Sequence, residues 1–194
     1  MKKLLISGFE PFGGEKINPS WDAVSNLPSV VGEYSIEKLL IPVEFSTAAQ
    51  KIIKIADEIC PDVIIAVGQA GGRDKITPEL VGINLRHAKI PDNRGYQPLD
   101  EPIIMGGPDA LFSTLPARKI AEAINAASIP SLVSYSSGAY VCNDVLYTLL
   151  AHFQGTKTKV GFIHVPYSKS QNKEPSMDQK EIEKALKIAI DSLE

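Results

Sequence analysis

Short apolar runs of strand length recur along the chain, and stretches with helical spacing lie between them. Residues 3–7, 62–67 and 159–165 are nearly continuous runs rich in Leu, Ile and Val. Apolar runs without polar alternation are typical of strands buried on both faces. Because such strands alternate with amphipathic segments, the pattern predicts an α/β layered fold.

The remaining elements are predicted from spacing and from Gly, Pro and capping residues. Asn18 is the expected cap of a helix that has Pro19 at its first position. Further strands are predicted at 35–43, 80–86 and 131–136, and helices at 19–27, 46–59, 117–127, 140–153 and 178–193. Gly- and Pro-rich segments predict loops at 8–18, 68–78 and 91–109. No repeat or linker divides the chain, so residues 1–194 are expected to form a single domain.

The composition narrows the range of partners. The chain has 194 residues, of which 44% are hydrophobic and 22% charged, as in ordinary globular domains. Its formal net charge is −3, and no run of Lys or Arg indicates a nucleic-acid groove or an anionic membrane surface. The expected partner is therefore a small molecule or a peptide.

Cysteine usage and the amino terminus predict a cytoplasmic protein. Cys60 and Cys142 are the two cysteines, fewer than a disulfide framework in a secreted domain would normally show. The apolar run near the amino terminus is too short for a signal-peptide core. No segment approaches the roughly 20 apolar residues that span a bilayer.

The chemistry is expected at the carboxyl ends of the strands, where sites form in open α/β sheets. Cys142 lies just past a predicted strand and near the start of a predicted helix. A helix amino terminus favours negative charge and should lower the pKa of a thiol there. Cys142 is therefore a candidate nucleophile, the alternative being a small buried hydrophobic residue.

A cysteine nucleophile usually needs a base, and the chain offers three histidines. His152 lies about 15 Å along the same predicted helix as Cys142, too far for a hydrogen bond. His87 follows a predicted strand and is expected to be solvated or satisfied. His164 ends an apolar run at the same sheet edge as Cys142, so it is the candidate base, although a core histidine has the same pattern.

An acid or amide should orient the histidine. Glu79 follows the Gly-rich loop 68–78, and Glu10 lies in a loop that also borders the sheet edge. The residues themselves leave both open.

Several segments in order along nearly the whole chain resemble the pyroglutamyl peptidase I family, also called pyrrolidone-carboxylate peptidases. These segments are GFEPFGG at 8–14, NPSW at 18–21, GQAGGRDKITPELVGIN at 68–84, IPDNRGYQP at 90–98, SSGAYVCN at 136–143 and GFIHVPY at 161–167. A Gly-rich loop alone would be weak evidence, but the ordered set is specific.

The resemblance implies a cysteine exopeptidase that removes N-terminal pyroglutamate from peptides through a Cys-His-Glu triad and a thioester. By position, Cys142 matches the nucleophile, His164 the base and Glu79 the orienting acid, which decides against Glu10. It also implies a three-layer α/β/α sandwich with a twisted mixed, mostly parallel sheet, and a homotetramer. It implies no metal or cofactor.

The resemblance also supplies a pocket for the flat, uncharged lactam, which needs apolar faces and a few hydrogen bonds. Two phenylalanines of the first loop sandwich the ring in the family, and Asn18 matches a polar residue that holds that loop or contacts substrate. The matching pocket residues here are Phe9, Phe12, Asn18, Gln69, Tyr140 and Val141.

The chain departs from the family pattern at four positions. Leu80 replaces a usually basic residue, Ser137 a usual alanine, and Tyr140 a frequent phenylalanine. Lys89 stands where many members have arginine, which keeps the charge but loses the planar fork. None of these is a triad member, so they bear on specificity and rate.

Two other functions fit parts of the sequence. A purine nucleoside phosphorylase-like enzyme would use GGR at 71–73 to hold phosphate, with a structural Cys142. A non-catalytic module would keep the pyroglutamyl pocket without turnover. Thiol alkylation and turnover assays distinguish these functions.

Overall fold

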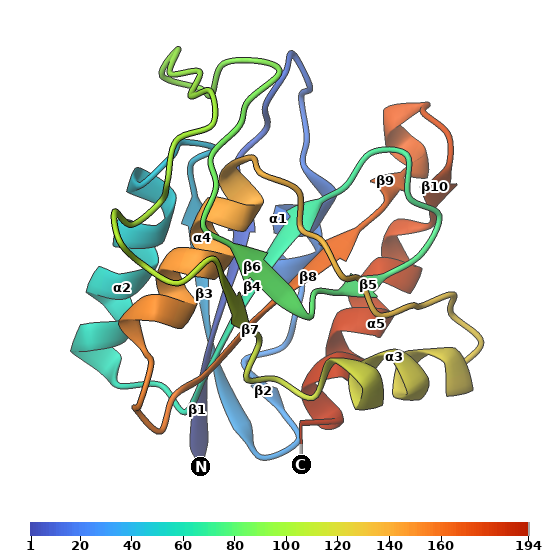
Figure 1. Cartoon of the computed structure of the whole chain (residues 1–194). Helices are drawn as coiled ribbons and strands as arrows, with labels where there is room; N and C mark the ends of the chain where they lie inside the picture. Colours follow the sequence, from blue (N-terminus) through green and yellow to red (C-terminus); the bar gives the residue numbers. More distant parts are fainter. Residues whose placement is uncertain (194) are drawn as a thin grey trace.

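A six-stranded sheet forms the centre of the computed structural model, which describes residues 1–193 (Figure 1). Its strand order is β2-β3-β1-β4-β8-β5. In sequence order the strands are β1 (Lys2–Phe9), β2 (Val30–Val31), β3 (Tyr34–Ile41), β4 (Val63–Gln69), β5 (Thr77–Pro78) and β8 (Lys159–Val165). The four inner strands are parallel, and β2 and β5 pair antiparallel at the two edges. The predicted mixed, mostly parallel sheet is confirmed.

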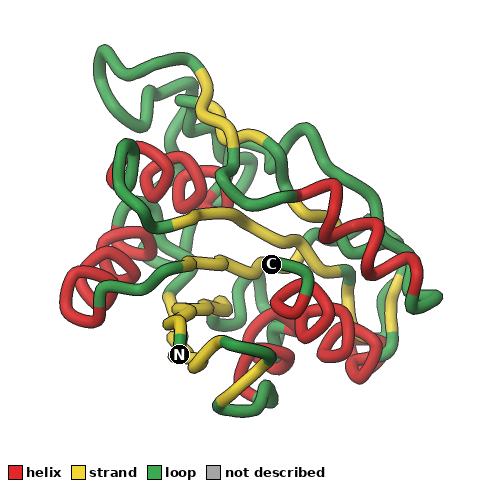
Figure 2. The backbone as a smooth tube through the Cα atoms, turned by 90° about the horizontal axis from the view of Figure 1, so that it is seen from below, coloured by secondary structure: helices red, strands yellow, loops and turns green. Residues whose placement is uncertain are grey.

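Helices cover both faces of this sheet (Figure 2). One face packs against α1 (Pro19–Ser25), α3 (Ala117–Ala126) and α5 (Gln179–Asp191), and the other against α2 (Thr47–Ile59) and α4 (Val141–His152). Successive strand residues point to opposite faces, so Leu4 and Ile6 join the first core while Leu5 joins the second. The layers are therefore helix, sheet and helix, as expected.

The start of α1 follows from its sequence. Asn18 has extended backbone angles, and its side chain accepts a hydrogen bond from the backbone N–H of Ser20. Pro19 occupies the first turn, where its missing N–H costs nothing. The predicted cap is confirmed.

The strand predicted at 131–136 is wrong. This segment runs parallel to residues 76–80 but forms only isolated bridges, at Ser131 and Ser134. Two backbone hydrogen bonds lie between these bridges, from Leu132 N to Ile76 O and from Ser134 N to Pro78 O. Regular pairing would need an N–H at position 78 between them, and proline has none. The ladder is therefore interrupted.

The strand predicted at 80–86 is shorter than expected. Only β6 (Val81–Ile83) is regular, and it pairs antiparallel with β7 (Ala110–Phe112) outside the main sheet. The segment 91–109 between them is mostly loop, as predicted, and in Figure 1 it descends from above the sheet toward β7. The last short elements are β9 (Tyr167–Ser168), the 3-10 helix η1 (Lys169–Gln171) and β10 (Ser176–Met177).

Within residues 1–193, no helix has the length and apolar character needed to cross a membrane. Cys60 and Cys142 are both free thiols.

Candidate active site

The carboxyl ends of β1, β4 and β8 meet at the upper edge of the sheet in Figure 1, and α4 begins there. The first-loop phenylalanines, the Gly-rich loop, the nucleophile candidate and His164 all belong to segments that reach this edge. Strand register thus brings together residues that are far apart in the sequence.

His164 and Glu79 form a buried pair. His164 is the next-to-last residue of β8, and Glu79 follows β5, whose Thr77 pairs with His164 across the ladder. The two side chains are 4% and 0% exposed, and Nδ1 of His164 lies 2.7 Å from Oε1 of Glu79. A carboxylate accepts hydrogen bonds, so this contact places the imidazole proton on Nδ1 and leaves Nε2 as the basic nitrogen.

Arg73 holds the same carboxylate from the other side. Its Nη1 donates to Oε1 of Glu79 at 2.6 Å and to Oγ1 of Thr77 at 2.6 Å. Its Nη2 donates to the carbonyl oxygen of Ser136 at 2.9 Å, in the loop that leads to the nucleophile helix. Arg73 therefore ties Glu79 to that loop as well as balancing its charge.

Cys142 lies over the strand pair that carries His164. It is the second residue of α4. Gly68 on β4 pairs with His164 on β8, and a Cβ built on Gly68 would come within 2.9 Å of the Cys142 sulfur. The sulfur and the imidazole therefore sit at neighbouring positions on one face of the β4–β8 pair. The ring of Phe162 packs beside His164, with 4.7 Å between ring centroids.

The electrostatics of Cys142 differ from the expectation for a helix amino terminus. Burial raises the pKa of its thiol to about 12, and the negative charge of Glu79 acts in the same direction. The positive charge of Arg73 and the backbone N–H of Cys142 lower it, but they do not compensate. The pKa is therefore raised where a lowering was expected, because removal from water outweighs the groups that favour the thiolate.

His164 and Glu79 are shifted toward a neutral imidazole and an ionised carboxylate. Burial lowers the pKa of His164, and its contact with Glu79 only partly offsets this. Burial acts to raise the pKa of Glu79, but the hydrogen bonds from His164 and Arg73 outweigh it, so the net pKa is lowered. The resting site therefore holds a neutral thiol, a neutral imidazole and a carboxylate paired with Arg73.

The first turn of α4 offers backbone donors. Its N-cap Tyr140 makes no side-chain capping bond, so the N–H groups of Val141, Cys142 and Asn143 have no partner within the helix. Asn143 is fully buried and is held by side-chain bonds to the backbone of Ile83. These N–H groups are suited to stabilising an oxyanion beside Cys142.

A small cavity of about 40 Å³ opens onto Cys142. Its lining comprises Phe9, Phe12, Asn18, Val43, Gln69, Tyr140 and Cys142. It contains every pocket residue expected from the resemblance except Val141, whose side chain is fully buried. Its aromatic faces and the two amide side chains of Asn18 and Gln69 suit a flat neutral ring.

The polar residues of this cavity are held in place by other side chains. Asn18 donates from Nδ2 to the carbonyl oxygen of Glu10 at 3.0 Å, so it fixes the first loop as well as lining the cavity. Oε1 of Gln69 accepts a bond from Gln171 at 2.9 Å. This bond engages Oε1 of Gln69, whereas its Nε2 makes no hydrogen bond among the described residues.

The other candidates of the sequence lie outside this group. Nε2 of His152 lies 3.6 Å from Asp57, and Nδ1 of His87 lies 2.8 Å from Asp100. Glu10 contributes only its backbone carbonyl to Asn18 among the hydrogen bonds of the site. Sequence reasoning missed Val43 and the role of Arg73, although Arg73 stood out within GGR at 71–73.

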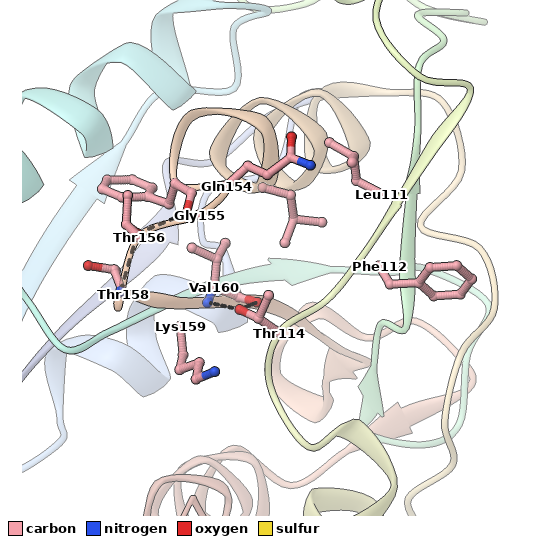
Figure 3. A pocket seen from close by; sticks show the side chains of 11 residues that line it. Leu111, Phe112, Thr114, Gln154, Gly155, Thr156, Thr158, Lys159 and Val160 are labelled. Atoms are coloured by element: carbon pink, nitrogen blue, oxygen red, sulfur yellow. Dashed lines mark hydrogen bonds between the residues drawn. The ribbon is translucent and has the colours of Figure 1, made fainter.

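A larger cavity lies at the opposite end of the sheet, beside the end of α4 and the start of β8 (Figure 3). It measures about 270 Å³, and Lys159 is the one titratable residue in its lining. Thr114 and Thr158 hydrogen-bond to backbone or neighbouring hydroxyl groups there. This cavity holds no nucleophile or base and is separate from the site at Cys142.

No group of three His, Cys, Asp or Glu residues that could hold a metal ion occurs within the described residues 1–193.

Comparison with known proteins gives one consistent result. A family model described as pyroglutamyl peptidase matches residues 2–194. A pyrrolidone-carboxylate peptidase from Thermococcus kodakarensis is 46% identical over 193 residues, which cover 97% of this chain and 94% of that protein. One from Erwinia tasmaniensis is 46% identical over 195 residues, covering 98% and 92%. The crystal structure of Bacillus amyloliquefaciens pyroglutamyl peptidase I has a TM-score of 0.96 at 44% identity and covers 100% of this chain and 97% of that chain.

Proposed function

Because the chain belongs to the pyroglutamyl peptidase family and is a cysteine peptidase, we propose that Cys142, His164 and Glu79 hydrolyse the bond after an N-terminal pyroglutamyl residue. The observation that carries this proposal is the 2.7 Å contact between Nδ1 of His164 and Oε1 of Glu79. It lies beside Gly68, the strand position over which the Cys142 sulfur packs.

The reaction begins with a neutral Cys142 thiol and a neutral His164 imidazole. Nε2 of His164 takes the proton of the Cys142 thiol as the sulfur attacks the pyroglutamyl carbonyl carbon. This order fits a thiol whose pKa is raised to about 12 and an imidazole whose pKa is lowered. Glu79 stabilises the imidazolium that forms, and Arg73 keeps Glu79 ionised.

The intermediate then collapses in two steps. Backbone N–H groups of the first turn of α4 stabilise the tetrahedral oxyanion. His164 returns its proton to the leaving amine, the C–N bond breaks, and a thioester to Cys142 remains. His164 next takes a proton from water, the hydroxide displaces the sulfur, and free pyroglutamate leaves while Cys142 regains its proton.

The cavity at Cys142 supports the choice of substrate. Phe9 and Phe12 supply apolar faces to a lactam, and Gln69 supplies polar groups at the same cavity. An ordinary amino terminus carries an ammonium group, which would lose its hydration between aromatic faces. The pocket therefore favours a neutral ring.

Hydrolysis of a pyroglutamyl-linked chromogenic amide tests the function, measured before and after iodoacetamide. We expect turnover that alkylation abolishes and that Cys142→Ser lacks. Cys60→Ser is the matched control and should stay active, because Cys60 is exposed and ends α2. Turnover that survives loss of Cys142 would refute the proposal, and pyroglutamyl binding without turnover would favour the non-catalytic module.

The phosphorylase-like alternative finds no support at Arg73. Its guanidinium is occupied by Glu79, Thr77 and the Ser136 carbonyl, so it is not free to hold phosphate. Chain-wide family membership also favours the peptidase.

The remaining expectations stay predictions. One catalytic domain over 1–194 is supported by the single main sheet and by the family match over 2–194. The homotetramer and the cytoplasmic location rest on the resemblance and on cysteine usage, and light scattering of the purified protein tests the tetramer.

A further inference from the structure

A second, larger hollow lies directly beside the lactam cavity. It measures about 370 Å³ and is lined by Phe12, His87, Lys89, Ile90, Ala139 and Tyr140. It shares Phe12 and Tyr140 with the small cavity that reaches Cys142. The two hollows are therefore adjacent, and these two aromatic side chains line both of them.

The walls of this hollow are tied to the nucleophile helix. The backbone N–H of His87 donates to the carbonyl of Ala139 at 2.8 Å. The hydroxyl of Tyr140 donates to the carbonyl of Pro91 at 3.0 Å. These bonds fix residues 87–91 against the segment that leads into α4, so the hollow keeps its place relative to Cys142.

Its position suits the part of the substrate that leaves. When the lactam occupies the small cavity, the amine side of the scissile bond must point away from it into the neighbouring space. The other hollow near the triad, lined by residues 72–75, 77 and 132–134, shares no lining residue with the small cavity. The hollow at Ile90 shares Phe12 and Tyr140 with the small cavity and therefore borders it.

The chemistry of the hollow is apolar with one unpaired cation at its rim. The side chains of Phe12, Ile90 and Tyr140 give it apolar walls. His87 is engaged with Asp100, whereas Lys89 is exposed and has no ion-pair partner among the described residues. An unpaired ammonium there attracts a carboxylate and repels a second cation.

We propose that this hollow receives the residue that follows pyroglutamate, that it favours an apolar side chain, and that Lys89 attracts the free carboxylate of pyroglutamyl dipeptides. The inference rests on the proposed function, because it places the leaving residue relative to a lactam bound at Cys142. It assigns the preferred substrates as short pyroglutamyl peptides with an apolar second residue.

The first test compares leaving residues by kcat/KM on pyroglutamyl-Leu, pyroglutamyl-Ser and pyroglutamyl-Lys. We expect kcat/KM for pyroglutamyl-Leu to exceed that for pyroglutamyl-Ser by about tenfold, the low end for a pocket that recognises apolar groups. The value for pyroglutamyl-Lys should be the lowest of the three. Ile90→Ser should reduce the Leu-to-Ser ratio to about two, since Ile90 supplies an apolar wall. Val30→Ser is the matched control, because Val30 is similarly exposed (45% against 48%) on the edge strand β2.

The second test compares pyroglutamyl-Leu with its amide. The acid should be favoured about threefold at low salt, as for an exposed ion pair, and the preference should vanish at about 0.5 M NaCl. Lys89→Gln should remove the preference, while Lys54→Gln on the exposed side of α2 should keep it.

Different outcomes separate the two proposals. If the protein cleaves all of these peptides and the ratios do not change in Ile90→Ser and Lys89→Gln, the hollow does not bind the leaving residue, although the peptidase assignment stands. If the unaltered protein cleaves no pyroglutamyl peptide, the proposed function itself fails.

Discussion

Arg73 and His164 contact the same oxygen of Glu79. Nη1 of Arg73 lies 2.6 Å and Nδ1 of His164 lies 2.7 Å from Oε1, although His164 is 85 positions away from Glu79 along the chain. One buried carboxylate oxygen thus holds the base on one side and its own counter-charge on the other.

Replacing Arg73 by Gln should lower kcat by about 10-fold to 100-fold with little change in KM, because the acid that orients His164 loses its anchor. The acid limb of kcat/KM should also move to higher pH, since the hydrogen bond from Arg73 lowers the pKa of Glu79 and its positive charge lowers the pKa of His164. Arg73→Lys should restore part of kcat by keeping the charge. Equal kinetics and pH profiles in Arg73→Gln would show that the contact has no role in turnover.

Stability between pH 9 and pH 10 should report the buried thiol. The pKa of Cys142 is raised from 9.0 to about 12 in the folded chain, so above pH 9 the unfolded chain releases a proton that the folded chain keeps. The free energy of unfolding should therefore fall by up to about 1.4 kcal/mol per pH unit. Tyr96, Tyr140 and Tyr147, whose pKa values are also raised from 10.0, add to this fall as the pH approaches 10, and they do so equally in a variant that lacks the thiol.

Urea titrations of the unaltered protein and of Cys142→Ser, repeated across that interval, measure this effect. The serine variant should show a flatter dependence on pH. Parallel curves for the two proteins would mean that the thiol titrates normally and that the site does not hold it in the neutral form.

Gly68→Ala should displace the nucleophile. The added methyl would come within 2.9 Å of the Cys142 sulfur and 2.8 Å of the Phe162 ring. We expect a loss of about 1–3 kcal/mol in stability from overpacking and a fall in kcat. Gly161→Ala is the matched control. Gly161 lies in the same central sheet as Gly68, but its added methyl would clash with Leu115, away from the site.

Thermal midpoints and kcat measured together distinguish the two glycine variants. Both should be destabilised, and only Gly68→Ala should lose turnover beyond what its folded fraction explains. A kcat reduced equally in both variants would attribute the effect to general destabilisation.

Ser137→Ala should weaken the fold slightly and leave the chemistry intact. Oγ of Ser137 donates to Oδ1 of Asn143 at 3.1 Å, so this side chain bonds the loop before α4 to the first turn of that helix. The expected loss is about 1 kcal/mol of unfolding free energy, with kcat/KM changed less than about twofold. Denaturant unfolding and steady-state kinetics check both values, and a large kinetic effect would place Ser137 in contact with substrate.

The sequence predicts the layers well because they depend on local patterns. Uninterrupted apolar runs indicate buried parallel strands, and Asn18 with Pro19 marks the start of α1. It fails at 131–136, where the expected strand depends on a partner segment whose Pro78 lacks one donor. Whether residues 131–136 form a strand therefore depends on the segment they pair with, and their own sequence does not show it.

The site is predictable only in part for the same reason. Cys142 and His164 could be selected from their positions at strand and helix ends, but the choice of Glu79 over Glu10 came from the resemblance. The distance that would decide between them joins segments far apart in sequence. The raised pKa of Cys142 was missed because it depends on how many atoms cover the sulfur, which the sequence pattern does not show.

Asn143 joins α4 to the segment that carries β6. Its side chain bonds to the backbone of Ile83 and Leu85, at the start of the excursion that returns through β7. It is also the residue immediately after Cys142, so a shift of the β6–β7 pair would reach the attacking atom through this amide as well as through the packing of α4 on both strands. Insertions or partner contacts on that pair should therefore change turnover while the central sheet keeps its shape.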